Sequence, residues 1–273
     1  MLYLLATPIG NIADISIRGL EALESCTEIL CEDTRTSKKL ISLLNSRNLL
    51  KNNHFNFTSL HSHNEDSRLD FLGVDFFKND VIFMSDAGMP CISDPGAKLV
   101  QFAQKHKIPY TIIPGASSVL SVVALSGFEG SEFHFHAFLP HKLSEKKQIL
   151  SQMLENTHIN IFFESTHRIL ESLEVLESIA PECAIFVAKE ITKMHEKFYF
   201  GKVCEVRAEI LNANINGEWA IALKNQNAKK SQVLSLSEVE SLSIPPKIKA
   251  KIIAKITNKS IEECYNTLIK GEK

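Results

Sequence analysis

Residues 85–96 read SDAGMPCISDPG and lie between a strand-like apolar run at 80–85 and a helix-like stretch at 97–107. Two Gly, two Pro and two Asp within this short segment favour a rigid, extended loop whose backbone amides and carbonyls can face a ligand. Ligands of open α/β sheets bind beyond the carboxyl ends of the strands. The segment therefore predicts a binding site at such an edge.

The alternation of strand and helix continues on both sides of this segment. Apolar runs at residues 2–6 and 28–31 each end in a polar loop before a helix-like stretch, and a further run occupies residues 110–113. Such alternation predicts βα units on a mostly parallel sheet. The loops that follow the strands are loop 1 (residues 8–11, PIGN), loop 2 (32–35, EDTR), loop 3 (85–96) and loop 4 (114–118, PGASS).

After residue 115 the alternation begins again with an apolar helix at 116–126. Further strands are expected at residues 133–139, 160–163, 184–188, 198–200 and 219–223. We therefore predict an α/β fold with an N-terminal α/β lobe at residues 1–115 and a C-terminal α/β lobe at 116–224. Residues 225–273 are expected to form a linker, begun by the polar run 224–230, and a small helical, helix-turn-helix-like module.

The charge of the chain is unevenly distributed. The formal net charge is −2, but residues 224–273 hold 10 Lys, no Arg and 5 Glu, so this segment carries +5 and the remainder −7. Lys247, Lys251 and Lys255 form a stripe at helical spacing, and Ser260 with Glu263 is typical of a capping box. A basic appendage can bind an anion such as nucleic acid, although a solvated lysine face is the simpler alternative.

Composition excludes several classes of protein. With 44% hydrophobic and 23% charged residues, the chain is neither disordered nor a coiled-coil rod. No apolar run approaches the ~20 residues that span a bilayer, and the apolar start lacks the basic flank of a signal peptide. Six scattered Cys without a CxxC pair favour a reducing cytoplasm.

Common motifs for phosphate, acyl or metal chemistry are missing from the sequence. There is no GxxxxGK[ST], GxGxxG or GxSxG, which removes the usual signatures of P-loop, dinucleotide-binding and serine-hydrolase folds. His61, His63 and Glu65 are the one conceivable metal set, but no HExxH or Cys partner completes it. We therefore expect no metal.

Several motifs in order carry a resemblance to a known family. They are LYLLATPIGN (2–11) with DIS (14–16), loop 2, SDAG and ISDPG of loop 3, PG (114–115), FES with HR (163–168) and KEITK with HE (189–196). Together they resemble the ribosomal RNA small subunit methyltransferase I family of the tetrapyrrole methylase superfamily, over residues 2–224. Thr166 stands where the family usually has Pro, and Gly19 where it usually has Ala.

This resemblance implies two lobes that bind S-adenosylmethionine in the cleft between them. It also implies methyl transfer to the ribose 2′-oxygen of a cytidine in the decoding region of 16S rRNA, as free rRNA or in the small ribosomal subunit, by a cytoplasmic homodimer. The donor-binding residues carried over are Pro8, Asp86, Ala87, Gly88, Pro90, Ile92, Ser93, Ser117 and Ser118. The two serines have an alternative role, since they could merely cap the helix that follows.

The resemblance and the charges near strand ends also give catalytic candidates. A ribose hydroxyl is a poor nucleophile, so a base or a nearby cation should ease its deprotonation. The candidates are Glu32, Arg35, Glu164, Arg168 and Lys193. We expect Lys193, with a pKa lowered by partial burial, or Glu164 to assist the 2′-OH. Arg35 and Arg168 are expected to grip phosphate, but any of these could instead form a structural ion pair.

Two other functions remain open from the sequence. A corrin or porphyrin C-methyltransferase would usually carry GxGPGD in loop 1, where this chain reads ATPIGN at residues 6–11. A non-enzymatic RNA-binding protein would bind rRNA without affinity for the methyl donor. The rigid loops at strand ends argue against the second alternative.

Overall fold

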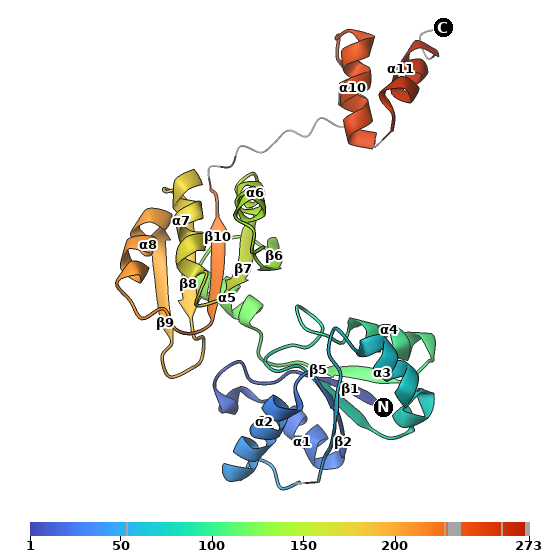
Figure 1. Ribbon diagram of the computed structural model, residues 1–273, viewed down its shortest axis with the longest axis vertical. Helices are drawn as coiled ribbons and strands as arrows, with labels where there is room; N and C mark the ends of the chain where they lie inside the picture. Colours follow the sequence, from blue (N-terminus) through green and yellow to red (C-terminus); the bar gives the residue numbers. More distant parts are fainter. Residues whose placement is uncertain (53, 227, 229–235, 258, 271–273) are drawn as a thin grey trace. The chain divides into compact units, whose positions relative to one another are not determined.

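The structure is a computed structural model that describes residues 1–52, 54–226, 228, 236–257 and 259–270 (Figure 1). The chain divides into two compact units, Met1–Asn227 and Ala228–Lys273. The larger unit contains two five-stranded sheets, one built from residues 2–113 and the other from 133–224. The lobe boundaries at 115 and 224 remain predictions.

The first sheet is wholly parallel, as the alternation of strands and helices predicts. Its strands are β1 (Leu2–Leu5), β2 (Glu28–Cys31), β3 (Asn56–Ser59), β4 (Val81–Met84) and β5 (Tyr110–Ile113), in the order β3-β2-β4-β1-β5. The edge strand β3 is not anticipated by the sequence analysis, because it is short and polar and none of its residues is buried.

Helices cover both faces of the first sheet. They are α1 (Ile17–Ser25), α2 (Thr34–Ser46), α3 (Glu65–Leu72) and α4 (Ala97–Lys105), with two 3₁₀ turns, η1 (Ile12–Asp14) and η2 (Val74–Lys78). One apolar cluster joins Leu23 of α1 and Ile41 of α2 to the sheet, and another joins Leu69 of α3 and Leu99 of α4 to its other face. The chain leaves β1 toward β2 with α1 on one face and leaves β4 toward β5 with α4 on the other. The adjacent ends of β1 and β4 are therefore the topological switch point, where ligands bind in such sheets.

The second sheet departs from the parallel pattern. Its strands are β6 (Phe133–Phe138), β7 (Ile159–Glu164), β8 (Ala184–Lys189), β9 (Lys197–Lys202) and β10 (Trp219–Lys224), in the order β6-β7-β10-β8-β9. Only β6 and β7 pair in parallel, and the other three pairs are antiparallel. The short connection 190–196 explains one of these pairs, because a parallel crossover needs a dozen or more residues.

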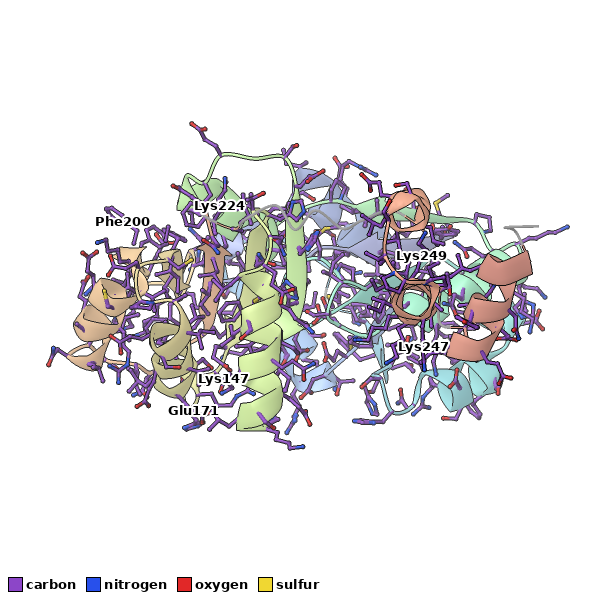
Figure 2. All side chains as sticks on the ribbon, turned by 90° about the horizontal axis from the view of Figure 1, so that it is seen from above. Lys147, Glu171, Phe200, Lys224, Lys247 and Lys249 are labelled. Atoms are coloured by element: carbon purple, nitrogen blue, oxygen red, sulfur yellow. The ribbon has the colours of Figure 1, made fainter. Side chains whose placement is uncertain are left out.

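The second sheet is also covered on both faces. Helix α5 (Ser118–Ser126) packs on β7, β8 and β10, while α6 (Leu143–Met153), α7 (Ile169–Ile179) and α8 (Val203–Leu211) cover the other face. The sequence analysis starts α5 at residue 116, but Ser117 is its N-cap. Phe200, at the free edge of the sheet, points away from the lobe and is 81% exposed (Figure 2).

The C-terminal unit is helical, as expected. It contains α9 (Leu236–Ser241), α10 (Pro246–Thr257) and α11 (Ile261–Lys270), which enclose Val239, Ala250, Ile253, Ala254 and Cys264. The predicted capping box is confirmed: Ser260 Oγ accepts from the Glu263 amide, and Glu263 Oε2 accepts from the Ser260 amide. The predicted lysine stripe is exposed. The predicted linker lies partly outside the described residues, at 227 and 229–230.

Two further expectations concern membranes and cysteines. Over the described parts of the chain, no helix combines the length and the apolar character needed to cross a membrane. All six cysteines are free thiols, and Cys26, Cys31, Cys183 and Cys264 are buried.

Candidate functional site

Loops 1 and 3 meet at the switch point of the first sheet. The Thr7 amide donates to the Gly88 carbonyl at 3.0 Å, and the Gly88 amide donates to the Thr7 carbonyl at 3.1 Å. Gly88 has a φ of +81°, which side chains rarely adopt, and a Cβ there would lie 3.2 Å from Ile9. Glycine at this position lets the two backbones approach closely.

Loop 2 is fastened to loop 3 by a carboxylate. The Asp33 amide donates to Asp86 Oδ1 at 3.2 Å. Asp33 also caps α2, accepting from the Arg35 amide at 2.8 Å, and its carboxylate binds the Arg35 guanidinium at 2.7 Å. The hydrogen bonds from Arg35 lower the pKa of Asp33 to about 2, so this carboxylate is ionised in the folded protein near neutral pH.

Loop 3 is anchored at its far end by the first helical residue of α3. The Gly96 amide donates to Glu65 Oε1 at 2.8 Å, and Glu65 is buried. Gly96 has a φ of +119°, and a Cβ there would collide with the Phe83 ring. Glu65 therefore has a structural role, and within the described ranges no three His, Cys, Asp or Glu side chains form a metal-binding group.

A cleft lies along these loops. Its larger cavity, of about 270 Å³, is lined by Glu32, Asp86, Ala87, Gly88, Met89, Ile92, Ser93, Asp94, Ser117, Ser118, Val119, Phe138, Phe163 and Glu218. A smaller cavity of about 100 Å³ shares Ala87, Ser118, Phe163 and Glu218 with it and adds Ile9, Ile191, Trp219 and Ala220. Both cavities thus take residues from the first and the second sheet regions.

Most of the residues predicted to bind the donor line this cleft. The exceptions are Pro8 and the buried Pro90, neither of which is among the described residues that line the two cavities. Ser117 is both a lining residue and the N-cap of α5, because its Oγ accepts from the Leu120 amide at 3.4 Å. The capping alternative therefore holds for the Ser117 side chain.

Four carboxylates line the larger cavity: Glu32, Asp86, Asp94 and Glu218. Burial is the main cause that raises the pKa of Glu32, Asp86 and Asp94. Repulsion from neighbouring carboxylates adds to it, from Asp86 and Asp94 on Glu32, from Asp86 on Asp94, and from Asp33 on Asp86. Asp94 is absent from the sequence-based site residues, although its place in loop 3 could have indicated it. In contrast, burial raises the pKa of the Cys91 thiol to about 11, so this loop offers no thiolate nucleophile.

Glu164 and Arg168 lie away from both cavities and bind each other. Arg168 Nη2 is 2.9 Å from Glu164 Oε1, the Glu164 side chain is fully buried, and its Oε2 accepts from Ser172 Oγ at 2.6 Å. Arg168 also donates to the Leu139 carbonyl at 2.8 Å. These contacts form the structural ion pair that the sequence analysis kept as an alternative.

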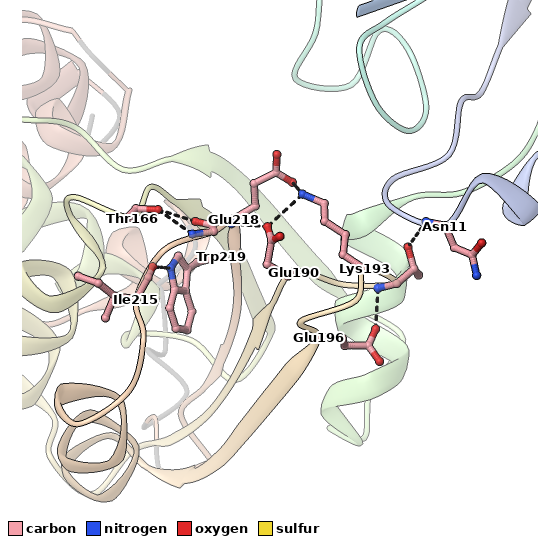
Figure 3. Close-up of polar contacts among 10 residues, drawn as sticks. Asn11, Thr166, Glu190, Lys193, Glu196, Ile215, Glu218 and Trp219 are labelled. Carbon is pink, nitrogen blue, oxygen red and sulfur yellow. Dashed lines mark hydrogen bonds and ion pairs between the residues drawn. The ribbon is translucent and has the colours of Figure 1, made fainter. Parts of the chain in front are cut away.

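The expectation that the pKa of Lys193 is lowered is wrong. Burial alone would lower it, but hydrogen bonds to Glu218 and Glu190, with the charges of both carboxylates, outweigh burial and raise it. Lys193 Nζ lies 2.9 Å from Glu218 Oε2 and 3.0 Å from Glu190 Oε1 (Figure 3). Lys193 is therefore a cation near neutral pH.

The loop that carries Lys193 touches loop 1. The Asn11 amide donates to Thr192 Oγ1 at 3.0 Å, and the Thr192 amide donates to Glu196 Oε2 at 2.6 Å (Figure 3). Glu190 and Thr192 both have positive φ, of 53° and 62°, a strained backbone that persists where the surroundings hold it. A Cβ at Gly10 would lie 2.5 Å from Lys193 Cγ, so glycine is needed for this approach.

Glu218 is a second carboxylate of the cleft, after Asp94, that the sequence analysis misses. It precedes β10 and lines both cavities, and Lys193 holds its carboxylate. Its own loop is tied to Thr166, whose Oγ1 donates to the Gly217 carbonyl at 2.7 Å and accepts from the Gly217 amide at 3.0 Å (Figure 3). Thr166 thus restrains the backbone through these hydrogen bonds, whereas a proline would restrain it through its ring.

The sequence was compared with models of known protein families. A family model described as Tetrapyrrole (Corrin/Porphyrin) Methylases matches residues 1–207. The chain belongs to this family. As a tetrapyrrole methylase by family, it is an enzyme of the methyltransferase class.

Two relatives narrow the relationship within the tetrapyrrole methylases. The ribosomal RNA small subunit methyltransferase I of Helicobacter pylori strain J99 is 40% identical over 287 residues, covering 100% of this chain and 99% of the relative. The enzyme of the same name from Campylobacter fetus subsp. fetus strain 82-40 is 40% identical over 270 residues, covering 98% and 100%. The chain is therefore also a member of the ribosomal RNA small subunit methyltransferase I family.

Solved structures support the two-lobed fold of the tetrapyrrole methylases. The methyltransferase CobJ aligns with a TM-score of 0.57 at 15% identity, covering 82% of this chain and 94% of that one. The uroporphyrin-III-C-methyltransferase of Thermus thermophilus aligns with a TM-score of 0.54 at 13% identity, with the same coverage. At these identities the likeness concerns the fold alone.

Proposed function

We propose that this enzyme transfers a methyl group from S-adenosylmethionine to the ribose 2′-oxygen of a cytidine in the decoding region of 16S rRNA. The observation that carries the proposal is the cleft at the switch point of the first sheet, lined by four carboxylates in a chain 40% identical to named rRNA methyltransferases. The cleft is where a parallel sheet of this kind binds its ligand.

The lining residues fit the proposed donor. A sulfonium donor is cationic, and the carboxylates of Glu32, Asp86 and Asp94 supply opposite charge at one wall. Ile92, Phe163 and Ala87 offer apolar surface beside them, and Ser117 and Ser118 begin α5, where backbone amides favour an anion such as a carboxylate. The bound donor would supply an electrophilic methyl group.

The chain's own task is then to position the ribose and accept its proton. Glu32 is our candidate for the base, because it lines the cleft and its raised pKa brings it closer to working pH. Glu164 and Lys193 are weaker candidates: Glu164 is buried in an ion pair and Lys193 stays protonated. We assign both, with Arg168, to positioning. The Arg35 side chain is 89% exposed, which leaves it able to contact a phosphate.

Further parts of the proposal concern the form of the substrate, the location of the enzyme and its oligomeric state. Its substrate would be 16S rRNA or the small ribosomal subunit in the cytoplasm, and no membrane is involved. We also propose a homodimer. The proposal is supported by exposed apolar side chains that a second copy of the chain could cover. Among them are Leu120 and Leu125 of α5 and Phe200 of β9. Light scattering of the wild type and of Phe200→Ser would detect the dimer and its loss.

One experiment tests the reaction. The enzyme is incubated with methyl-labelled donor and either small subunits that lack the modification or a reduced porphyrin substrate, and donor binding is measured in parallel by calorimetry. We expect label in rRNA only and measurable donor binding. Label in the tetrapyrrole would instead support a C-methyltransferase, and rRNA binding without donor affinity would support a non-enzymatic RNA-binding protein.

A further inference from the structure

Besides the two cavities of the cleft, a separate cavity lies in the first sheet region. It has a volume of about 610 Å³ and is lined by Lys38, Ile41, Ser42 and Asn45 from α2 and by Phe55, Asn56 and Phe57 at the edge strand β3. This volume is within the range of small-ligand sites. We call this cavity the α2–β3 pocket.

The pocket has the groups that a nucleobase needs for stacking. Phe55 and Phe57 lie two residues apart, so both rings are on one side of β3, with their centroids 6.0 Å apart. Lys38 Nζ lies 5.5 Å from the centroid of the Phe57 ring. Aromatic faces beside a cation are the combination that binds unpaired nucleotides, because the ring stacks on a base and the cation attracts a phosphate.

The pocket also contains an unused hydrogen-bond acceptor. Asn45 Oδ1 is buried and has no donor within hydrogen-bonding distance. The neighbouring amide of Asn56 is already used, since its Nδ2 donates to Glu28 Oε1 at 2.6 Å. The side-chain amide torsion of Asn is broad, so a small rotation would present Oδ1 to a donor such as the exocyclic amine of a base.

One face of α2 connects the pocket with the cleft. Arg35, Lys38, Ser42 and Asn45 follow one another at intervals of three, four and three residues, which places them on one helical stripe. Helix α2 begins at loop 2, whose Glu32 lines the cleft. At 1.5 Å per residue, the stripe extends about 15 Å from Arg35 to Asn45.

We propose that the α2–β3 pocket binds an unpaired nucleotide of the RNA substrate that flanks the nucleotide held in the cleft. The inference rests on the proposed function. The base stacks on one of the two phenylalanine rings and contacts the other at an angle, because the ring planes of Phe55 and Phe57 are tilted by 55°. Lys38 contacts a phosphate, and Asn45 Oδ1 accepts from an exocyclic amine. The pocket therefore prefers cytosine, adenine or guanine over uracil, which has no such amine.

The experiment compares Phe57→Leu, Lys38→Gln and Asn45→Leu with two control variants. Phe71→Leu changes a phenylalanine on α3 that is 80% exposed, and Lys39→Gln changes the exposed lysine next to Lys38 on α2. With unmodified small subunits, each pocket variant should raise KM about five- to tenfold, because losing a stacking or phosphate contact weakens RNA binding by this order. Their kcat, their donor affinity and their melting temperature should change little, and the controls should match the wild type.

A second readout separates binding from a merely structural role. Single-stranded ten-nucleotide RNAs that carry one 5-iodocytidine, which keeps the exocyclic amine, are cross-linked to the enzyme, and the labelled peptide is identified by mass spectrometry. We expect cross-links to residues 55–57 in the wild type and weaker binding of oligo(U) than of oligo(C), a difference that Asn45→Leu removes. Unchanged KM in all three pocket variants, or cross-links only elsewhere, would overturn the proposal. Failure of the proposed function would look different, since the wild type itself would then transfer no methyl group to rRNA.

Discussion

Lys193 is held between Glu190 and Glu218, and both carboxylates lie within 3.0 Å of its ammonium group. This environment raises its pKa, so we predict that it orders Glu218 and does not take a proton from substrate. Lys193→Met should lower methyl transfer about tenfold, less than the loss of a general base, and leave the shape of the pH–rate profile unchanged. Lys193→Arg should retain most of the activity. A pH–rate profile that changes its shape in Lys193→Met would contradict this role.

Unlike the side chain of Lys193, which is partly exposed, that of Glu164 is fully buried, and Arg168 is its counter-ion. Removing one partner leaves a buried charge uncompensated, so Glu164→Gln should lower the free energy of unfolding by about 3 kcal/mol in urea denaturation. Glu145→Gln is the control, because its carboxylate is 54% exposed and pairs with the exposed Lys142. The control should change stability by less than about 1 kcal/mol. Equal effects of the two substitutions would argue against a buried structural pair.

Sequence reasoning at the scale of residues finds charges but not their partners. Glu164, Arg168 and Lys193 were identifiable because they follow strands. Whether such a charge reacts or merely pairs depends on contacts with residues distant in sequence, such as Glu218, which reaches Lys193 from the start of β10. That contact adds to the effect of the neighbouring Glu190 in raising the pKa of Lys193, and it could not be derived from local spacing.

At the scale of elements, the contact between loop 1 and the β8–β9 connection depends on Gly10. A Cβ at Gly10 would lie 2.5 Å from Lys193 Cγ and 2.6 Å from Thr192 Oγ1. We therefore predict that Gly10→Ala separates the two loops and lowers methyl transfer at least tenfold, with a small change in melting temperature.

Gly73→Ala is the matched control for that substitution. Gly73 has a φ of +62° but open space around it, so its replacement strains the backbone without touching the cleft. It should lower the melting temperature and keep methyl transfer near the wild-type value. If Gly10→Ala were as active as Gly73→Ala, the contact would not matter for the reaction.

Three of the four cleft carboxylates, Glu32, Asp86 and Asp94, give a pH dependence with a definite sign. Because burial and repulsion from neighbouring carboxylates raise their pKa values, the folded state holds their protons more tightly than the unfolded chain. The cost to stability is absent below the ordinary carboxyl pKa and appears as the pH rises through the folded values. Donor affinity should increase over the same range, because the ionised carboxylates attract a cation.

Asp94→Asn tests whether ionisation of a cleft carboxylate lowers stability and raises donor affinity. At pH 7 it should raise the melting temperature by about 1–3 °C, because it removes one half-buried charge, and weaken donor binding several-fold in calorimetry. At pH 4 its melting temperature should approach that of the wild type. Asp70→Asn, at an exposed position of α3, should change neither quantity. Donor binding that is unaffected by Asp94→Asn at pH 7 would remove Asp94 from the site.

The elements themselves were predicted unevenly, for physical reasons. The buried strand β2 and the partly exposed edge strand β5 both appear as apolar runs with clear turn signals, so their predicted bounds agree with the structure. Helix α3 presents no apolar stripe, since Leu69 is its one buried aliphatic residue and Phe71 is exposed. Two of the three antiparallel pairs of the second sheet depend on β10 lying between β7 and β8, a long-range choice that local periodicity does not encode.

At the scale of the whole molecule, the exposed lysines of α10 are expected to add affinity for rRNA. Replacing Lys247, Lys251 and Lys255 by Gln should weaken binding of small subunits, measured from 50 to 200 mM salt. The slope of log affinity against log salt should fall by up to about 3, because each lost phosphate contact reduces it by nearly 1. Lys147→Gln on α6 is the control and should keep the slope. An unchanged slope in the triple variant would mean that this stripe is a solvated face.

The central claim is that the cleft directs a methyl group onto a ribose oxygen of rRNA. The most direct measurement is to methylate unmodified small subunits with labelled donor, digest the 16S rRNA and locate the label by mass spectrometry of the nucleosides. The account predicts a single labelled cytidine of the decoding region, with the methyl group on its 2′-oxygen. Label on a base, or on no rRNA nucleotide, would contradict it.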